Sequence, residues 1–247
     1  MDALGIAAAS GLRSRMESLE ILANNIANAG TAGYKADRER YTTYWAAEAT
    51  SALDGGKGGA GVSPVVEKNW IDFTQGPLTQ TRVPTHVSLN GPGFFTFRRG
   101  EETVYSRNGE WQINAAGRLV NGEGLEATGA NGQPVQVDPA LALEIRGDGS
   151  IWQGGAPTGQ LRITEFSDPQ MLQKAGRTLY RWTGPEDGAR AATGTRVVQG
   201  ALEASNLGAA EGAVRMVNVL RQFEALQKAL QLGSEMSRRL VDEVSKV

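Results

Sequence analysis

The sequence predicts an α+β fold, with terminal α-helices that form a coiled-coil-like core domain and a central all-β domain of short antiparallel strands. Three observations predict it. Apolar residues recur at steps of three and four near both ends of the chain, and between them apolar and polar residues alternate with a period of two. Glycine is also abundant, with 32 residues. The expected organisation is an N-terminal core helix over 1–33, an extended linker region over 34–69, a β domain over 70–202 and a C-terminal core helix over 203–247.

The first helix is predicted between Ala3 and Asn28, a stretch with no proline and many alanines. Its apolar stripe consists of Leu12, Met16, Leu19, Ala23 and Ile26. These steps of four and three follow the heptad pattern of a helix that packs against another helix. Gly30 and Gly33 can then end the helix and reverse the chain.

A glycine-rich stretch follows between Thr50 and Gly61. Its composition is typical of a flexible linker. It lacks the Gly-Lys-Ser/Thr ending and the strand-to-helix context of a phosphate-binding loop, so no nucleotide site is expected there.

Short strands are predicted from about Trp70 to Leu202. The pair Asn108-Gly109, flanked by alternating residues over 103–107 and 110–114, predicts a β-hairpin because a type I′ turn needs positive φ twice. Further turn signals are Asn90-Gly91, Asn121-Gly122, Asn131-Gly132 and Gly147-Asp148-Gly149, and further strand candidates cover 150–152, 160–166, 178–182 and 196–202.

The last helix is predicted from about Asn206 to Val247, with Ser205 or Asn206 as its N-cap. Its stripe follows steps of three and four without a slip and consists of Met216, Val219, Phe223, Leu226, Leu230, Gly233, Ser237, Leu240, Val244 and Val247. The small residues Gly233 and Ser237 narrow this seam. They indicate either the close approach of another backbone or a weak point, and the sequence leaves both open.

Composition and charge argue against several classes of function. The net charge is −2 and the basic residues are scattered, so no nucleic-acid partner is expected. The chain has no cysteine, which excludes disulfides, thiolate metal sites and a cysteine nucleophile. No stretch approaches the ~18 apolar residues of a membrane span. Asp2 stands where a signal peptide carries positive charge, so no cleavable signal peptide is expected.

The candidate catalytic groups favour no enzyme, and we expect no catalytic residue, no cofactor and no metal ligand. His86 is the single histidine, and one histidine without a second ligand is far more often structural. No serine lies in a Gly-x-Ser-x-Gly motif. The carboxylate pairs Glu101/Glu102 and Glu123/Glu126 lie in predicted turns, where solvated charge is the usual state.

The two heptad stripes are the strongest functional signal. Their simplest interpretation is a helical hairpin within one chain. However, the first helix opens the chain and the last closes it, with a whole β domain between them. Because isolated helices are marginal in water, we expect the two helices to be poorly ordered until several copies pack together.

Three segments resemble the flagellar rod, hook and hook-associated family. Residues 22–35 read Leu-Ala-Asn-Asn-Ile-Ala-Asn-Ala-Gly-Thr-Ala-Gly-Tyr-Lys and are similar to its N-terminal signature. Residues 87–95, followed by 105–109, resemble its first β-domain segment, and residues 199–206 resemble its junction into the C-terminal helix. The three segments lie in family order, and the similarity runs from end to end.

The resemblance implies a structural protein of the bacterial flagellum. Family members are exported through the flagellar type III apparatus without a cleaved signal peptide and assemble into an axial tube that crosses the periplasm. Their terminal helices pack as the core of the tube, and the β domain lies outside. The implied partners are copies of itself, other flagellar rod subunits and the export apparatus, with no small-molecule substrate.

The stripes and the signature together predict the residues in contact between subunits. In the signature, amide side chains satisfy backbone groups at a helix terminus. The predicted contact residues are Leu12, Met16, Leu19, Ile26, Asn24, Asn25, Asn28, Gly33, Tyr34, Met216, Val219, Phe223, Leu226, Leu230, Leu240 and Val244.

The length and the single β domain suit a rod protein rather than the longer hook subunit. The short, glycine-rich stretch from Tyr41 to Val66 lacks the insertion expected of the distal-rod (FlgG-like) type, which favours the proximal-rod (FlgF-like) type. Pro84-Thr85-His86 departs from the Pro-Leu-Asp usual in the family at this place.

Two alternatives of another class stay open at this stage. One is an adhesive or carbohydrate-binding β domain with oligomerising helices, for which Trp111, Trp152 and Trp182 should form an exposed cluster. The other is a peptidoglycan hydrolase, for which two carboxylates such as Glu123 and Glu126 should converge in a cleft.

Overall fold

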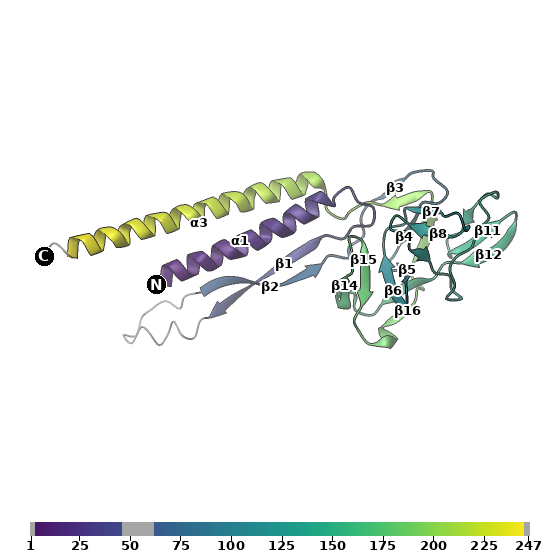
Figure 1. Cartoon of the computed structure of the whole chain (residues 1–247), viewed down its shortest axis with the longest axis horizontal. Helices are drawn as coiled ribbons and strands as arrows, with labels where there is room; N and C mark the ends of the chain where they lie inside the picture. Colours follow the sequence, from purple (N-terminus) through teal and green to yellow (C-terminus); the bar gives the residue numbers. More distant parts are fainter. Residues whose placement is uncertain (1–2, 46–61, 245–247) are drawn as a thin grey trace. The chain divides into compact units, whose positions relative to one another are not determined.

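The computed structural model describes residues 3–45 and 62–244, which form two compact units. The helical unit contains the described residues of 3–27, 37–70 and 209–244, and the β unit contains residues 28–36 and 71–208. Terminal helices and a central antiparallel β-rich unit confirm the predicted α+β class (Figure 1). The glycine-rich stretch 50–61, predicted to be a linker, lies outside the described residues.

Two antiparallel helices dominate the helical unit. Helix α1 (Ala3–Ala27) has 25 residues and α3 (Ala209–Val244) has 36, so at 1.5 Å per residue they measure ~37 Å and ~54 Å. The helices lie side by side (Figure 1). The strands β1 (Asp37–Trp45) and β2 (Val62–Ile71) form a two-stranded sheet, and the sequence analysis predicted neither strand.

Helix α1 is tied to strand β1 by polar side chains. The Asn25 amide donates to the Asp37 carbonyl at 2.8 Å, and the Asp37 N–H donates back to the Asn25 Oδ1 at 3.0 Å. Two helical turns earlier lies Ser18, whose hydroxyl donates to a Glu39 carboxylate oxygen at 2.8 Å. These bonds satisfy the first backbone groups of β1, so Asn25 fixes where the strand begins.

The β unit is built from short antiparallel strands in several sheets (Figure 1). The largest sheet has the order β14-β15-β6-β5-β9-β8-β7, with β13 beside β5 and β16 beside β13. Its strands are β5 (Phe94–Arg99), β6 (Glu102–Ser106), β7 (Trp111–Ile113), β8 (Leu119–Asn121), β9 (Glu126–Ala127), β13 (Ile163–Phe166), β14 (Leu172–Lys174), β15 (Leu179–Trp182) and β16 (Ala189–Ala191).

Smaller sheets complete the β unit, in the orders β10-β11-β12, β17-β4 and β18-β3. Their strands are β3 (Leu78–Gln80), β4 (Val87–Asn90), β10 (Glu144–Ile145), β11 (Ser150–Gln153), β12 (Ala156–Gln160), β17 (Arg196–Gln199) and β18 (Ala201–Glu203). Two short 3₁₀ helices are η1 (Pro169–Met171) and η2 (Glu186–Gly188).

Strand β5 packs on both of its faces, because successive side chains of a strand point to opposite sides. Phe95 and Phe97 contact the buried Trp111 edge to face, with centroid distances of 4.6 and 5.8 Å. On the opposite side Phe94 packs against Tyr180 at 6.0 Å. The four-residue run of buried positions at the start of β5 therefore reflects a strand covered on both sides.

The hairpin predicted at Asn108-Gly109 is wrong. Strand β6 pairs with β5 and β15, whereas β7 pairs with β8, so the two strands flanking this dipeptide are not partners. A Cβ atom at Gly109 would collide with the backbone carbonyl of Val87, and the Val87 N–H donates to the Gly109 carbonyl at 2.9 Å. Glycine is needed there because the backbone of another strand approaches closely.

Other turn signals were informative. Strands β10 and β11 form an antiparallel pair around Gly149, whose φ is 84°. Strands β8 and β9 likewise pair across the turn that follows Asn121, with Gly124 at a φ of 79°. Positive φ is the conformation that favours glycine, so these glycines mark true chain reversals.

Candidate functional site

The predicted heptad stripe on α3 is the half-buried face of that helix. Between residues 213 and 236 the half-buried positions are Met216, Val219, Phe223, Leu226, Leu230 and Gly233, and every other position is exposed. Within one subunit this seam faces α1, because a Cβ atom at Gly11 would stand 3.5 Å from Leu226 Cδ1. The side chains of Leu240 and Val244 lie outside the described ones.

The face that α1 buries differs from its most apolar stripe. The buried positions are Gly11, Ser14, Ser18, Leu22 and Asn25. Small side chains there leave room for the large residues of the α3 seam. Of the predicted contact residues, Leu12, Leu19 and Ile26 are half-buried, and Met16 is 53% exposed. Their role between subunits stays a prediction.

The signature at the end of α1 divides into two parts. Asn24 is exposed and Asn28 is half-buried, whereas Asn25 is buried against β1 as described above. Past the helix end, Gly33 and Tyr34 are buried in the β unit. The role of these residues in contacts between subunits stays a prediction.

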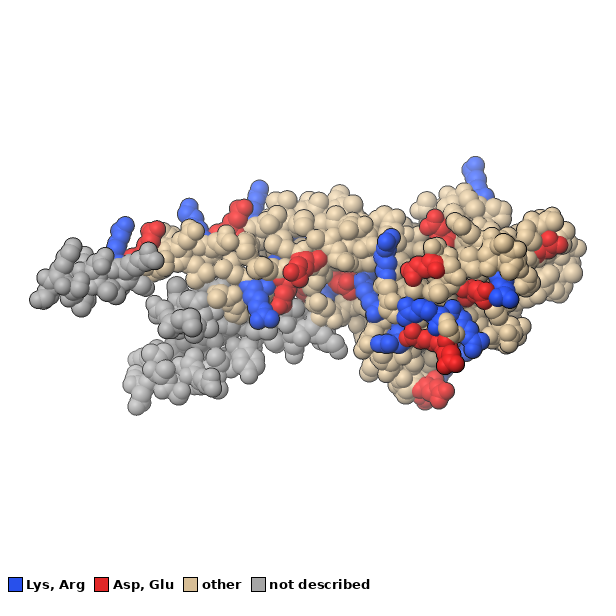
Figure 2. Space-filling view, viewed as in Figure 1, with Lys and Arg blue, Asp and Glu red and all other residues tan. Residues whose placement is uncertain are grey.

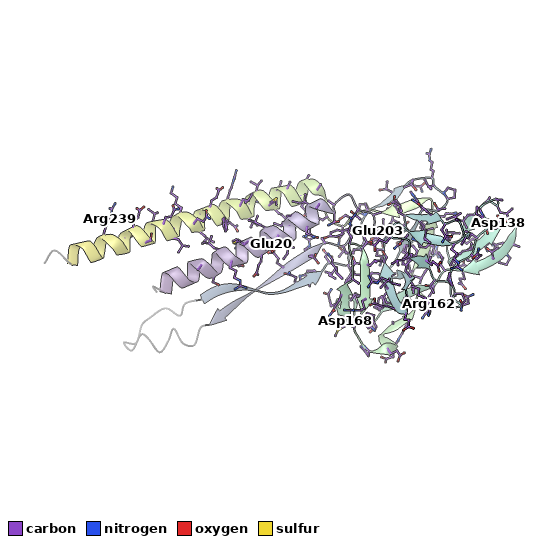
Figure 3. The ribbon with its side chains drawn as sticks, viewed as in Figure 1. Glu20, Asp138, Arg162, Asp168, Glu203 and Arg239 are labelled. Atoms are coloured by element: carbon purple, nitrogen blue, oxygen red, sulfur yellow. The ribbon has the colours of Figure 1, made fainter. Side chains whose placement is uncertain are left out.

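A buried carboxylate, Glu203 at the end of β18, is the centre of a buried polar cluster in the β unit (Figure 3). Its Oε1 accepts from the Lys35 Nζ at 2.6 Å and from the Gly76 N–H at 2.9 Å. Its Oε2 accepts from Arg107 at 3.4 Å. The Glu203 backbone carbonyl also accepts from the Gly33 N–H at 2.7 Å. We call these five residues the joint.

The joint is an ionic cluster shielded from water. The side chains of Lys35 and Glu203 are fully buried and that of Arg107 is 2% exposed. Burial lowers the pKa of Lys35 below its ordinary value, against the opposing charge of Glu203, and it lowers the pKa of Arg107 in the same way. One carboxylate therefore compensates the charges of two buried cations. Asp72 adds a further negative charge that acts on Lys35.

Two glycines let the backbone approach the joint. A Cβ atom at Gly33, where φ is 67°, would collide with the backbone between Arg107 and Asn108. A Cβ atom at Gly76 would collide with the Ala204 carbonyl. Any side chain at either position would thus force the chain segments of the joint apart.

A second set of contacts extends the joint. The Asn206 amide donates to the Asp72 carbonyl at 2.6 Å, and its Oδ1 accepts from the Ala36 N–H at 2.9 Å. Tyr34 and Leu207 are buried together in a small apolar cluster with Ala36. Asn206 and Ser205 thus bond within the β unit, whereas the sequence analysis placed one of them at the N-cap of a helix that begins at Ala209.

The joint unites the three segments that carried the family resemblance. Lys35 ends the first segment, Arg107 lies in the second and Glu203 in the third. The three charged residues were not predicted to form a site. The available signal was one basic or acidic residue in each segment, with nothing to indicate that they meet.

The residues of the alternative functions do not form a site. Glu126 pairs with Arg118 at 2.6 Å, and Glu102 pairs with Arg99 at 2.8 Å, while Glu123 is exposed. Figure 2 shows that charged side chains of both signs are interspersed on the face in view. His86 Nδ1 lies 3.1 Å from the Thr81 hydroxyl.

The tryptophans do not form an exposed cluster either. Trp111 is 1% exposed inside the core. Trp152 lies under the Arg146 guanidinium at 3.7 Å, and Trp182 stacks on Phe166 at 4.7 Å. An adhesive aromatic platform is therefore unsupported.

Within the described residues, no group of three or more His, Cys, Asp or Glu side chains is arranged to hold a metal ion. Over the same part of the chain, neither helix combines the length and apolarity needed to cross a bilayer.

Three parts of the chain match known protein families. Residues 7–35 match the family described as Flagella basal body rod protein. Residues 88–153 match the Flagellar hook protein FlgE/F/G D1 domain, and residues 198–243 match the Flagellar basal body rod FlgEFG protein C-terminal. These matches cover most of both helices, strands β5 to β11 and all three charged residues of the joint, Lys35, Arg107 and Glu203.

Similarity to whole proteins extends over nearly the full chain. The flagellar basal-body rod protein FlgF of Caulobacter vibrioides is 32% identical over 237 residues, covering 93% of this chain and 92% of the relative. The rod protein FlgG of Buchnera aphidicola subsp. Acyrthosiphon pisum is 30% identical, covering 94% and 95%. FlgG of Bacillus subtilis is 28% identical, covering 94% and 96%.

Proposed function

The chain belongs to the flagellar basal-body rod protein family, of the FlgF/FlgG type, and we propose that it is a structural subunit that polymerises through α1 and α3 into a helical axial tube. The tube transmits torque and leaves a channel for export. The observation that supports this most directly is the pair of long helices. They pack on each other within the subunit through one face each, and they still expose large apolar residues such as Met16 and Met236.

The same proposal includes the finer points of location and partners. The subunit is exported by the flagellar type III apparatus without a cleaved signal peptide, and it joins copies of itself and other rod subunits in the part of the rod that crosses the periplasm. Its role is mechanical, with no substrate or cofactor. Relatives of both types match over nearly the full chain, and the FlgF-like subtype is the one we favour.

Swimming in cells that carry only variant subunits tests the proposal. Phe223→Asp places a charge in the α3 seam and should abolish swimming, while the β unit keeps its unfolding transition. Gln231→Asp, on an exposed position of the same helix, is the matched control and should swim normally. Normal swimming of Phe223→Asp cells would contradict the proposed role of the helices.

A further inference from the structure

The last stretch of the β unit, residues 195–207, is bonded to segments that range from Gly33 to Glu165. We call this stretch the closing segment. It contains strands β17 and β18 and ends two residues before α3 begins. Strand β17 pairs with β4 and strand β18 pairs with β3. Among the described residues, β3 and β4 have no other strand partner, so both depend on the closing segment.

Strand β17 joins parts of the chain that are far apart in the sequence. The Gln199 amide donates to the carbonyls of Pro84 and Leu143, each at 2.8 Å. Its Oε1 accepts from the Ile145 N–H at 3.0 Å. Val197, on the same strand, is buried in the main apolar core of the unit. One strand of the closing segment thus holds the entry to β4 and the strand β10 in place.

Strand β4 needs β17 in order to complete the core. Val87 and Leu89 of β4 are fully buried in the same apolar cluster as Trp111. They lie opposite Gln199 and Val197 of β17. Without β17, the backbone groups on this edge of β4 would have to stay hydrated or be buried without a partner, and the second alternative is costly. The core around Trp111 therefore closes only when the closing segment is in place.

The joint adds an electrostatic reason for late closure. Lys35 and Arg107 precede the closing segment, whereas Glu203, the carboxylate that pairs with both of them, lies within it. A compact state that forms before the closing segment arrives would bury two cations without this carboxylate. Burying a charge without its partner is strongly unfavourable, so the earlier part of the chain is biased against premature collapse around the joint.

On the basis of the proposed function, we propose that the closing segment controls when the β unit folds during export. Its bonds reach back to Gly33, so both ends of the unit must be outside the export channel before the sheets close, whichever end leaves first. Closure of so long a loop limits the folding rate, because chain entropy is lost before the compensating contacts form. A partly exported chain stays open and can still move through the channel.

A disulfide that forms the closure in advance tests this proposal in a chain that contains no cysteine of its own. Thr79 and Leu202 lie directly opposite each other on β3 and β18. Opposed Cα atoms of antiparallel strands are about 4.5–5.5 Å apart, which a disulfide can span. The full-length variant Thr79→Cys/Leu202→Cys is oxidised while folded, unfolded in urea and refolded by dilution.

Near-ultraviolet circular dichroism of the buried Trp111 follows the refolding of the β unit. We expect the linked chain to refold at least about tenfold faster than the same variant with its thiols reduced, because the link removes most of the loop-closure entropy. The reduced form is the reference, since it carries the same two substitutions.

The matched control is Arg98→Cys/Thr103→Cys, at two exposed positions that lie opposite each other in the hairpin of β5 and β6. Its disulfide closes only a short loop, so it should change the refolding rate by less than about twofold. A second measurement uses the unsubstituted chain. In pulse-labelling hydrogen exchange during refolding, the amides of β5 and β6 should become protected in the same phase as those of β4 and β17.

The outcomes separate this proposal from the proposed function. If the link between positions 79 and 202 leaves the refolding rate unchanged or lowers it, closure does not limit folding and the proposal is wrong. It is also wrong if the control link accelerates refolding as much, or if β5 and β6 are protected in an earlier phase than β4 and β17. None of these results affects the proposed function, which normal swimming of Phe223→Asp cells would contradict on its own.

Discussion

The joint makes a quantitative prediction about Glu203. The change Glu203→Gln keeps the size of the side chain and one acceptor oxygen but removes the charge that Lys35 and Arg107 share. Breaking a buried ion pair by removing one partner costs about 3–5 kcal/mol, because the remaining charge is left without compensation. The side chains of this cluster are 0–2% exposed, so the cost of breaking a buried ion pair applies to it in full.

The loss should be visible as a lower unfolding temperature of the β unit. For a unit of this size, 1 kcal/mol corresponds to roughly 2–4 °C, so Glu203→Gln should lower the midpoint by about 6–20 °C. Near-ultraviolet circular dichroism reports on the buried Trp111 of the same unit. Glu123→Gln, on an exposed turn, is the matched control and should change the midpoint very little.

A double-mutant cycle tests whether Lys35 is the reason for the loss. Because Lys35→Met removes one of the two uncompensated cations, adding it to Glu203→Gln should cost less than the sum of the single changes by at least about 1 kcal/mol. The reasoning fails if Glu203→Gln alone costs under about 1 kcal/mol or if the two changes are additive.

Three further predictions concern the same unit. Gly33→Ala should lower the unfolding free energy in urea by about 1–3 kcal/mol, because it strains a positive φ and meets backbone atoms, whereas Gly30→Ala meets no atom within 4 Å and should be nearly neutral. Gly109→Ala should be destabilising by a similar amount, and Gly122→Ala, in open space, should not; equal midpoints within either pair would contradict the packing described. Burial lowers the pKa of Lys35, so at pH values just below the unfolded value of about 10.4 the unfolded chain holds an extra proton and this group makes stability rise with pH. The advantage of the wild type over Lys35→Met should therefore grow as the pH is raised toward about 10, and a shrinking advantage would refute it.

The helices were predictable because a heptad pattern is local. The α3 stripe through Phe223 and Leu226 coincides with the half-buried positions of the structure. On α1 the same reasoning selected the largest apolar residues, including Met16. The structure instead buries Gly11 and its small neighbours, because a helix that packs against large side chains needs small ones opposite them.

The joint was not predictable from local pattern. Lys35 and Glu203 are 168 positions apart in the sequence, and each reads as an ordinary surface charge in its own segment. The hairpin error at Asn108-Gly109 has a related cause: glycine serves both positive φ and close backbone approach, and only the neighbouring strand decides which. Long-range contacts thus determine both the formation of the joint and the pairing of the strands around Asn108-Gly109.

All four places where the chain passes between the helical unit and the β unit lie close in sequence to the joint or its extension. The end of α1 is followed by Gly33 and Lys35, and β1 begins one residue after Ala36. Strand β2 leads into Asp72, and α3 begins two residues after Leu207. Each crossing is therefore close in sequence to backbone that these contacts hold inside the β unit.

This arrangement has a mechanical consequence for the β unit. Sliding one segment would require the Lys35–Glu203 pair and the Asn206 hydrogen bonds to break together, since Asn206 bonds both the segment at Ala36 and the segment at Asp72. Bonds loaded in parallel share a force, whereas bonds loaded in series break one at a time. Within the β unit, a single buried cluster therefore resists sliding of these segments more than separate surface contacts would, because surface ion pairs exchange with water and contribute little individually.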